Sequence, residues 1–95
     1  MKLNPENVEF LKTDAVKPSP DALMQVWTVY RHPSDFPPGT WVARRSEVHE
    51  GQKVLMTPDI REAKSLEDLR YQLPRGLTHI PRMAQEDPVI AEHWI

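Results

Sequence analysis

The sequence contains no cysteine, and this absence removes several kinds of chemistry. Without a thiol, a chain forms no disulfide, binds no metal through thiolates and has no cysteine nucleophile. The absence of cysteine therefore favours a reducing compartment for this protein.

Long apolar runs are missing as well. No stretch of about 18 apolar residues occurs, so the sequence predicts no transmembrane helix. The first residues, Met1–Glu6, lack the apolar core of a secretion signal. Together with the absence of cysteine, these features predict a cytoplasmic protein.

Neither sign of charge dominates the chain. Its net charge is −2, from 12 Lys and Arg against 14 Asp and Glu. Residues 31–82 carry a small basic excess, whereas residues 83–95 hold three acidic residues and no Lys or Arg. Dedicated nucleic-acid binders usually have a stronger basic footprint. The three glycines are scattered, so no glycine-rich phosphate loop is expected.

The length of 95 residues indicates one domain with one modest core. Residues 24–95 are expected to form this domain, and residues 1–23 to be a peripheral segment. That segment has a possible short helix carrying Val8 and Leu11, followed by a proline-rich connector over Lys17–Pro20. The seven aromatic side chains are expected to form the bulk of the core. They are Phe10, Trp27, Tyr30, Phe36, Trp41, Tyr71 and Trp94.

The clearest local signal predicts a short helix from about Ser65 to Leu73. Ser65 can cap the first free N–H groups, and Asp68 stands where a capping box has its acidic partner. Three leucines share one face of this helix, namely Leu66, Leu69 and Leu73. A single helix this short must lie on something to be stable.

Runs rich in β-branched and aromatic residues supply the surface for that helix. They predict strands at Met24–Arg31, Thr40–Val48, Val54–Ala63 and Val89–Ile95. The first two are expected to pair as an antiparallel hairpin around a long loop. The third is expected to kink near Pro58, and residues 74–88, with three prolines, are expected to be irregular. The predicted fold is α+β: an antiparallel sheet of three to four strands with one main helix packed on one face.

Several short motifs match a known group of sequences. They are Val26–Tyr30, Val42–Arg45, Ser65–Arg70, Pro74–Leu77, Ile80–Arg82 and Asp87–Ile95. Over about residues 26–95 the chain resembles a group of small uncharacterised bacterial proteins. The resemblance implies a bacterial cytosolic origin and a single compact domain. It transfers no catalytic residue, because the group has no assigned function.

Arginine is the first candidate for binding chemistry. The chain has seven arginines against five lysines, and the arginine fork suits carboxylates and phosphates. Adjacent strand residues point to opposite faces, so Arg44 and Arg45 cannot join one patch. Either they bind an anion or a partner, or they are solvated residues paired with Glu47, Glu62 or Glu92.

Catalytic and metal-binding patterns are sparse. The four histidines lack ligand spacing, so no metal site and no cofactor are expected. The serines lack a nucleophile-elbow setting. His32, Ser34 and Asp35 have the residue types of a hydrolytic triad, but their closeness within a proline-rich loop is more typical of a turn. An enzyme is therefore not favoured.

The loop from His32 to Gly39 is a stronger candidate for binding. Phe36 stands between Asp35 and two prolines, which reduce the entropy lost when the ring is presented to a partner. Phe36 can instead fold back onto the edge of the core. The candidate partner-binding set is His32, Asp35, Phe36, Arg44 and Arg45.

Three classes of function follow from these features. The leading hypothesis is a small non-enzymatic module of the bacterial cytosol that binds another protein. The alternative is a nucleic-acid-binding module that uses arginines and the sheet aromatics Trp27 and Trp41, provided that their face is open. A small hydrolase is the third class.

Overall fold

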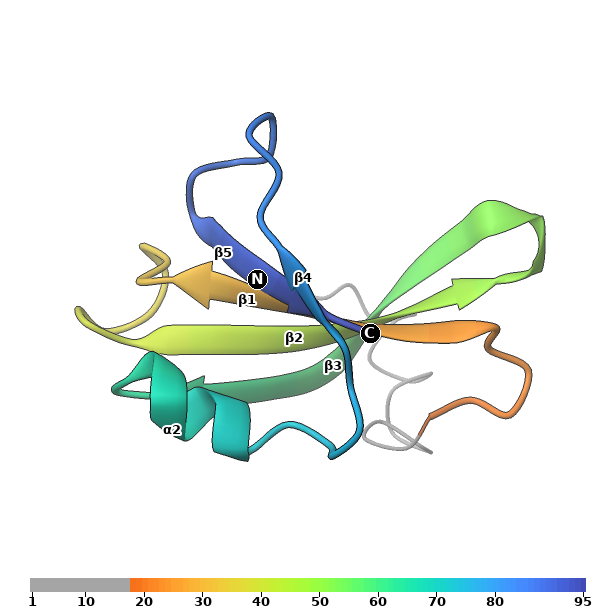
Figure 1. Cartoon of the computed structure of the whole chain (residues 1–95), viewed down its shortest axis with the longest axis horizontal. Helices are drawn as coiled ribbons and strands as arrows, with labels where there is room; N and C mark the ends of the chain where they lie inside the picture. The colour runs from red at the N-terminus through yellow and green to blue at the C-terminus, as the bar shows by residue number, and fades with distance from the viewer. Residues whose placement is uncertain (1–17) are drawn as a thin grey trace.

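The structure, a computed structural model, describes residues 18–95, which form a five-stranded antiparallel sheet and one short α-helix (Figure 1). The strands are β1 Met24–Arg31, β2 Trp41–His49, β3 Lys53–Ala63, β4 His79–Pro81 and β5 Ile90–Trp94. Their order across the sheet is β3-β2-β1-β5-β4. The α+β architecture is confirmed, but the sheet has five strands, so the prediction of three to four was too low.

The strand missing from the prediction is β4, within residues that were expected to be irregular. It pairs with β5 alone and forms one edge of the sheet. Pro81 is tolerated there because an edge strand can leave one side of its backbone unpaired. Thr78 and Ile95 extend the pairing through two backbone hydrogen bonds of 2.7 and 3.0 Å.

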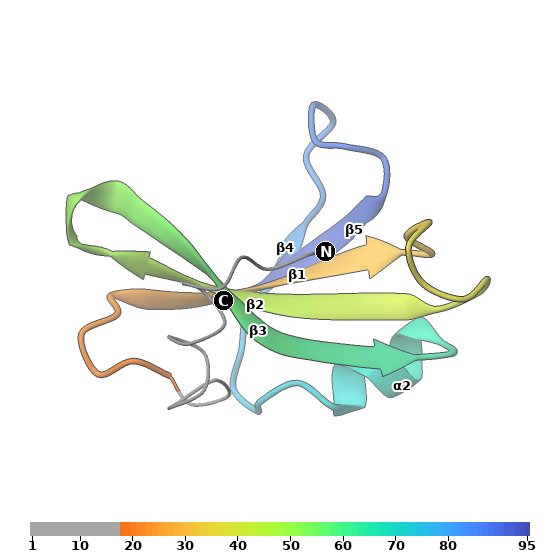
Figure 2. The ribbon, with the colours of Figure 1, turned by 180° about the vertical axis from the view of Figure 1, so that it is seen from behind.

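The predicted hairpin of β1 and β2 is present, with Val29 opposite Ala43 and Trp27 opposite Arg45. β2 continues through a tight turn, η1 at Glu50–Gln52, into β3. The backbone at Gly51 is left-handed, with φ of 79°, a conformation that glycine adopts without strain. The β2–β3 hairpin extends to the end of the molecule opposite the helix α2 (Figures 1 and 2).

The β3 strand is continuous but irregular at the predicted place. Arg44 pairs with Ile60 and Ser46 with Met56, so the register between β2 and β3 shifts between these pairs and leaves Thr57–Asp59 opposite Arg45. Thr57 donates its hydroxyl to the carbonyl of Arg45 at 2.7 Å and thereby satisfies a buried backbone group at this bulge.

The helix α2 spans Leu66–Tyr71 and begins as the sequence predicts. The Ser65 hydroxyl accepts a hydrogen bond from the backbone N–H of Asp68 at 3.1 Å. Leu69 is fully buried and Leu73 nearly so, against Trp27, Val29 and Ala43 of the sheet. The leucine stripe therefore anchors the helix on one face, here called the covered face.

The aromatic residues are only partly in the core. Trp27 is buried, and Trp41 and Trp94 pack against the core cluster. Tyr71, however, is 83% exposed, so its expected core role was wrong. Its position on α2 lies two residues from Leu69, on the side of the helix that faces solvent.

Residues 18–23 are attached to the sheet. The Ser19 N–H donates to the carboxylate of Glu47 at 2.9 Å, and the Leu23 N–H donates to the carbonyl of Val48 at 2.8 Å. The expected helix carrying Val8 and Leu11, together with Phe10, lies outside the described residues. No helix within residues 18–95 has the length and apolar character needed to cross a membrane.

Candidate functional site

The loop between β1 and β2 is built from two successive turns. The Phe36 N–H donates to the carbonyl of Pro33 at 3.1 Å, and the Thr40 N–H donates to the carbonyl of Pro37 at 3.2 Å. Gly39 has φ of 81°, which fits a turn that has proline and then glycine at its centre. These turns hold Phe36 beside the sheet face opposite α2.

A half-open pocket of about 440 Å³ lies between this loop and that face. We call it the loop pocket. Its floor comes from alternate residues of the sheet, Tyr30 on β1, Val42 and Arg44 on β2, and Ile60 on β3. Asp35 and Phe36 from the loop, and Asp87 and Val89 from the segment before β5, complete its lining. Its volume is within the range of small-ligand sites in proteins.

Arg44 is the cation of the pocket floor, and only 9% of it is exposed. Its Nε donates to the carbonyl of Thr57 at 2.8 Å, so the strand bulge orients the guanidinium. Burial lowers the pKa of Arg44, an effect that neighbouring Tyr30 partly opposes. Burial also raises the pKa of Tyr30, despite the attraction of Arg44, and its phenol is neutral at physiological pH.

Three of the five predicted partner-binding residues lie together. Asp35, Phe36 and Arg44 all line the loop pocket. His32 does not line it, and its ring packs edge-on against Trp41 with centroids 5.0 Å apart. Arg45 projects to the covered face, as strand alternation requires.

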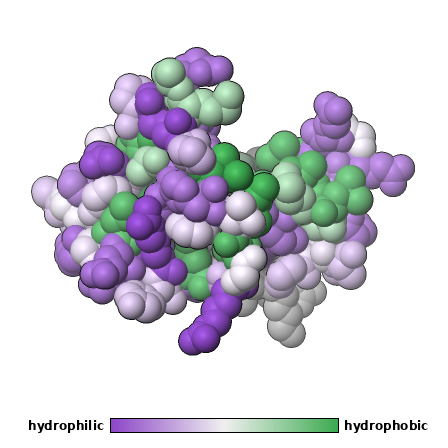
Figure 3. Space-filling view, viewed as in Figure 1, coloured by the Kyte–Doolittle hydropathy of each residue, from purple (hydrophilic) through white to green (hydrophobic). Residues whose placement is uncertain are grey.

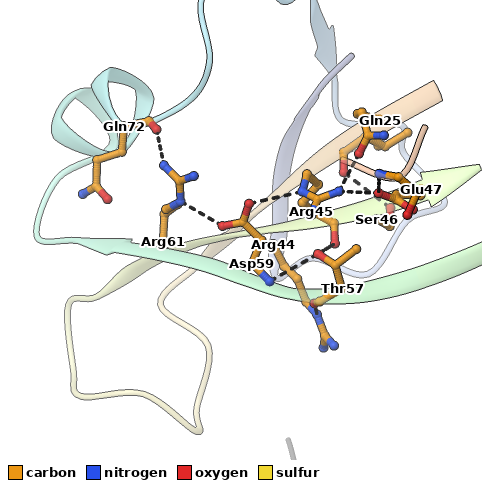
Figure 4. A network of polar contacts seen from close by, with 11 residues as sticks. Gln25, Arg44, Arg45, Ser46, Glu47, Thr57, Asp59, Arg61 and Gln72 are labelled. Carbon is orange, nitrogen blue, oxygen red and sulfur yellow. Dashed lines mark hydrogen bonds and ion pairs between the residues drawn. The ribbon is translucent and has the colours of Figure 1, made fainter. Parts of the chain in front are cut away.

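Arg45 belongs to a buried polar network (Figure 4). It is 3% exposed and donates to Glu47 at 2.6 Å, to Asp59 at 3.2 Å and to Gln25 at 2.6 Å. Asp59 also accepts from Arg61 at 3.0 Å. Arg45 is paired, as one reading of the sequence held, but it is buried rather than solvated. The network joins β1, β2 and β3 through charged side chains that are buried and paired with one another.

Arg61 connects this network to the C-terminal end of α2. Its guanidinium donates to the carbonyl of Gln72 at the end of α2 at 2.6 Å and lies 5.0 Å from the ring centroid of Trp27. One arginine therefore caps the helix C-terminus, covers a core tryptophan and pairs with Asp59.

Glu47 is the most constrained carboxylate of the network. Burial by itself would raise its pKa, but hydrogen bonds from the Ser19 N–H, His49 and Arg45 outweigh this effect and lower the pKa to about 2. The His49 ring nitrogen lies 2.9 Å from the carboxylate. Glu47 therefore remains ionised at every physiological pH.

A second buried carboxylate joins the helix to β5, the strand next to the edge strand β4. Glu92 on β5 is 4% exposed and accepts two hydrogen bonds from Arg70 of α2. Its other partners are His79 at 3.0 Å and the indole N–H of Trp94 at 2.7 Å. Burial opposes ionisation of Glu92, but the bonds from Arg70 and Trp94 prevail and lower its pKa. Both carboxylates serve the fold.

Each tryptophan has an arginine of the same chain over its ring. Arg31 lies 4.9 Å from the centroid of Trp41, and Arg70 lies 5.7 Å from that of Trp94. Trp27, covered by Arg61, is 1% exposed. The two tryptophans named for base stacking, Trp27 and Trp41, lie on the covered face and pack in or against the core.

The uncovered side of the sheet, here called the open face, carries a set of apolar side chains that the sequence analysis did not single out as a site. Cross-strand pairing aligns Met24, Val48 and Val54 in one row and Val26 and Met56 in the next. Met24, Val54 and Met56 are 41%, 59% and 47% exposed. Figure 3, seen from the side on which α2 lies, shows further hydrophobic side chains over the β2–β3 hairpin, and the open face is on the far side of that view.

A signal for this face was present in the sequence. The β1 run is apolar at both alternating sets of positions, whereas one short helix can cover only one side of a sheet. In residues 18–95, α2 is the only α-helix, and its buried leucine contacts the covered face. The open face therefore has no second layer of secondary structure within that range.

Metal and hydrolytic chemistry have little geometric support in the described part of the chain. Residues 18–95 contain no group of three or more His, Asp or Glu side chains placed to hold a metal ion. His32 contacts Trp41, while Ser34 and Asp35 line the loop pocket, so the three triad-like residues do not converge on one cavity.

Comparisons of the chain with protein-family models, with curated proteins and with solved structures gave no significant match. In residues 18–95, the open face and the loop pocket are the two surfaces that suggest a function.

Proposed function

We propose that this chain is a small non-enzymatic interaction module of the bacterial cytosol and that it binds another polypeptide on its open face. The observation that supports this most is the exposure of Met24, Val54 and Met56 in adjacent cross-strand rows. Contiguous exposed apolar side chains are typical of interaction surfaces, because water covers them at a cost in free energy.

The loop pocket extends the same surface. Ile60 lines the pocket and lies four residues after Met56 on β3, which is roughly 13 Å of extended strand. An extended or helical segment of a partner could span both. Aromatic and arginine side chains dominate binding hot spots, and the pocket offers Phe36 and Arg44.

The free edge of β3 is less suitable for this contact. Pro58 lacks a backbone N–H, and the register shift at Thr57–Asp59 distorts the strand beside it. These are features that limit the addition of another strand to an edge. The open face, with its projecting side chains, is the better docking surface.

Binding of nucleic acid has weaker support. The tryptophans of that alternative face the core, and the loop pocket combines two aspartates with one arginine. A basic open face with exposed aromatic rings would have favoured a nucleic-acid partner instead.

The test compares Met56→Glu with Tyr71→Glu in the full chain. Met56 lies on the open face, whereas Tyr71 is more exposed but lies on α2, away from that face. In quantitative affinity capture from the native host, proteins enriched by the wild type should be lost with Met56→Glu and kept with Tyr71→Glu. Both variants should keep the wild-type melting temperature within about 3 °C, since an exposed substitution changes stability little. Equal capture by all three chains would refute the proposal.

A further inference from the structure

The charges of the loop pocket indicate what the partner presents there. Asp35 and Asp87 carry two negative charges at its exposed rim, and Arg44 carries one positive charge on its floor. The formal charge of the lining is therefore −1. Asp87 is held in place, because its carboxylate accepts a hydrogen bond from the Val89 N–H at 3.0 Å.

The rest of the lining suits the body of a long cationic side chain. Phe36 and Tyr30 supply aromatic rings, and Val42, Ile60 and Val89 supply aliphatic surface. Lysine and arginine bury their methylene stems on such surfaces and keep the charged head near water. Aromatic rings also attract cations through their electron-rich faces. The pocket combines an apolar wall with carboxylates at its rim, which matches both parts of such a side chain.

An anionic group fits the same pocket less well. Arg44 is largely buried and donates its Nε to the carbonyl of Thr57, so its fork is committed in part to the strand bulge. An incoming carboxylate or phosphate would also meet the two rim aspartates. Like charges brought together in this way reduce affinity.

We propose that the loop pocket binds the side chain of a lysine or arginine presented by the polypeptide that docks on the open face. This inference depends on the proposed function for its source of the cation. It assigns Asp35 and Asp87 to the charged head and Phe36 to the methylene stem.

The experiment is a titration of the full chain, labelled with ¹⁵N, with four capped amino acids. N-acetyl-arginine amide and N-acetyl-lysine amide are the cationic probes. N-acetyl-norleucine amide keeps the aliphatic stem without the charge, and N-acetyl-glutamate amide tests an anion. The cationic probes should shift the backbone amides of residues 34–36 and of Val89 in a saturable manner at millimolar concentrations. The other two probes should leave these amides unchanged.

The matched variant is Asp35→Asn with Asp87→Asn, in which asparagine keeps an oxygen that can accept from Val89. It should weaken binding of the cationic probes about threefold to tenfold, the range expected when two partly exposed charge pairs are lost. Norleucine shifts equal to the lysine shifts, glutamate shifts at the same amides, or no cationic shifts at all would each overturn the inference.

Met56→Glu separates this inference from the proposed function. That variant should still bind the cationic probes, because residue 56 does not line the pocket. If the probes fail while capture still depends on Met56, the pocket assignment is wrong and the interaction module stands. If the probes bind while capture ignores Met56, the pocket assignment stands and the open face is not the docking surface.

Discussion

At the scale of single residues, Glu47 links the fold to pH. Its carboxylate is 3% exposed and bonds to the Ser19 N–H, His49 and Arg45. Its pKa falls from 4.5 to about 2 on folding, since these bonds outweigh burial. A lowered pKa means that the ionised group stabilises the folded state above about pH 4.5, and that this contribution is lost as the pH falls through about 2.

We therefore expect Glu47→Gln to destabilise the protein by about 3 kcal/mol at pH 7, which corresponds to the size of the pKa change. The difference between wild type and variant should narrow steadily from pH 5 towards pH 2. Urea unfolding at several pH values measures it. Glu50→Gln, at the exposed turn of the same hairpin, is the control and should stay close to the wild type. A gap that is constant with pH would contradict the assignment.

Arg44 and Arg45 show what sequence alone can predict about a side chain. Strand alternation correctly separates them onto two faces. Their burial is not predictable in that way, because it depends on β2 having neighbours on both sides and on Asp59 arriving from β3. Glu47, two residues along the same strand, was among the partners expected for Arg45. Asp59, a further partner, is fourteen residues away across a bulge, a distance at which local patterns carry no information.

At the scale of elements, α2 is a short helix whose stability comes from its contacts. Six residues are too few for a stable helix in isolation. The Ser65 cap, the Leu69 contact with the core and the bonds from Arg70 to Glu92 fix its start, middle and end.

Leu69→Ala should consequently cost about 2–4 kcal/mol, since the residue is fully buried and the sheet below it cannot collapse into the cavity. Tyr71→Ala is the matched control on the same helix and should change stability by less than about 0.5 kcal/mol, because its ring is in solvent. Denaturant melts of both variants provide the measurement. Similar losses for the two would mean that α2 does not pack through Leu69.

The elements also divide into those with a local signal and those without one. The helix, the β1–β2 hairpin and the turn at Gly51 follow from caps, alternation and turn residues. The strand β4 does not, because its three residues include Pro81 and gain their regularity only by pairing with β5. The loop pocket was half predictable: Asp35 and Phe36 followed from the loop, but Asp87 comes from a distant connection.

At the scale of the whole molecule, several of the arginines are paired with carboxylates of the same chain. The networks around Glu47 and Glu92 take up Arg45 and Arg70, and Arg61 joins Asp59 to the helix. Because each of these pairs is neutral, the other charges account for the net charge of the chain, which is −2. Binding of nucleic acid without sequence preference depends on neutralising phosphates with basic side chains, and affinity then falls steeply with salt.

We therefore expect the protein to bind random single-stranded RNA or DNA no more tightly than about 1 μM at physiological salt, the upper end of ordinary non-specific affinity. Fluorescence anisotropy with labelled oligonucleotides at several salt concentrations measures this, with a basic protein of similar size as the positive control. Tight binding that weakens steeply with salt would contradict the expectation. If Met56→Glu also abolished that binding and Tyr71→Glu did not, the open face would be a binding surface for nucleic acid rather than for a polypeptide.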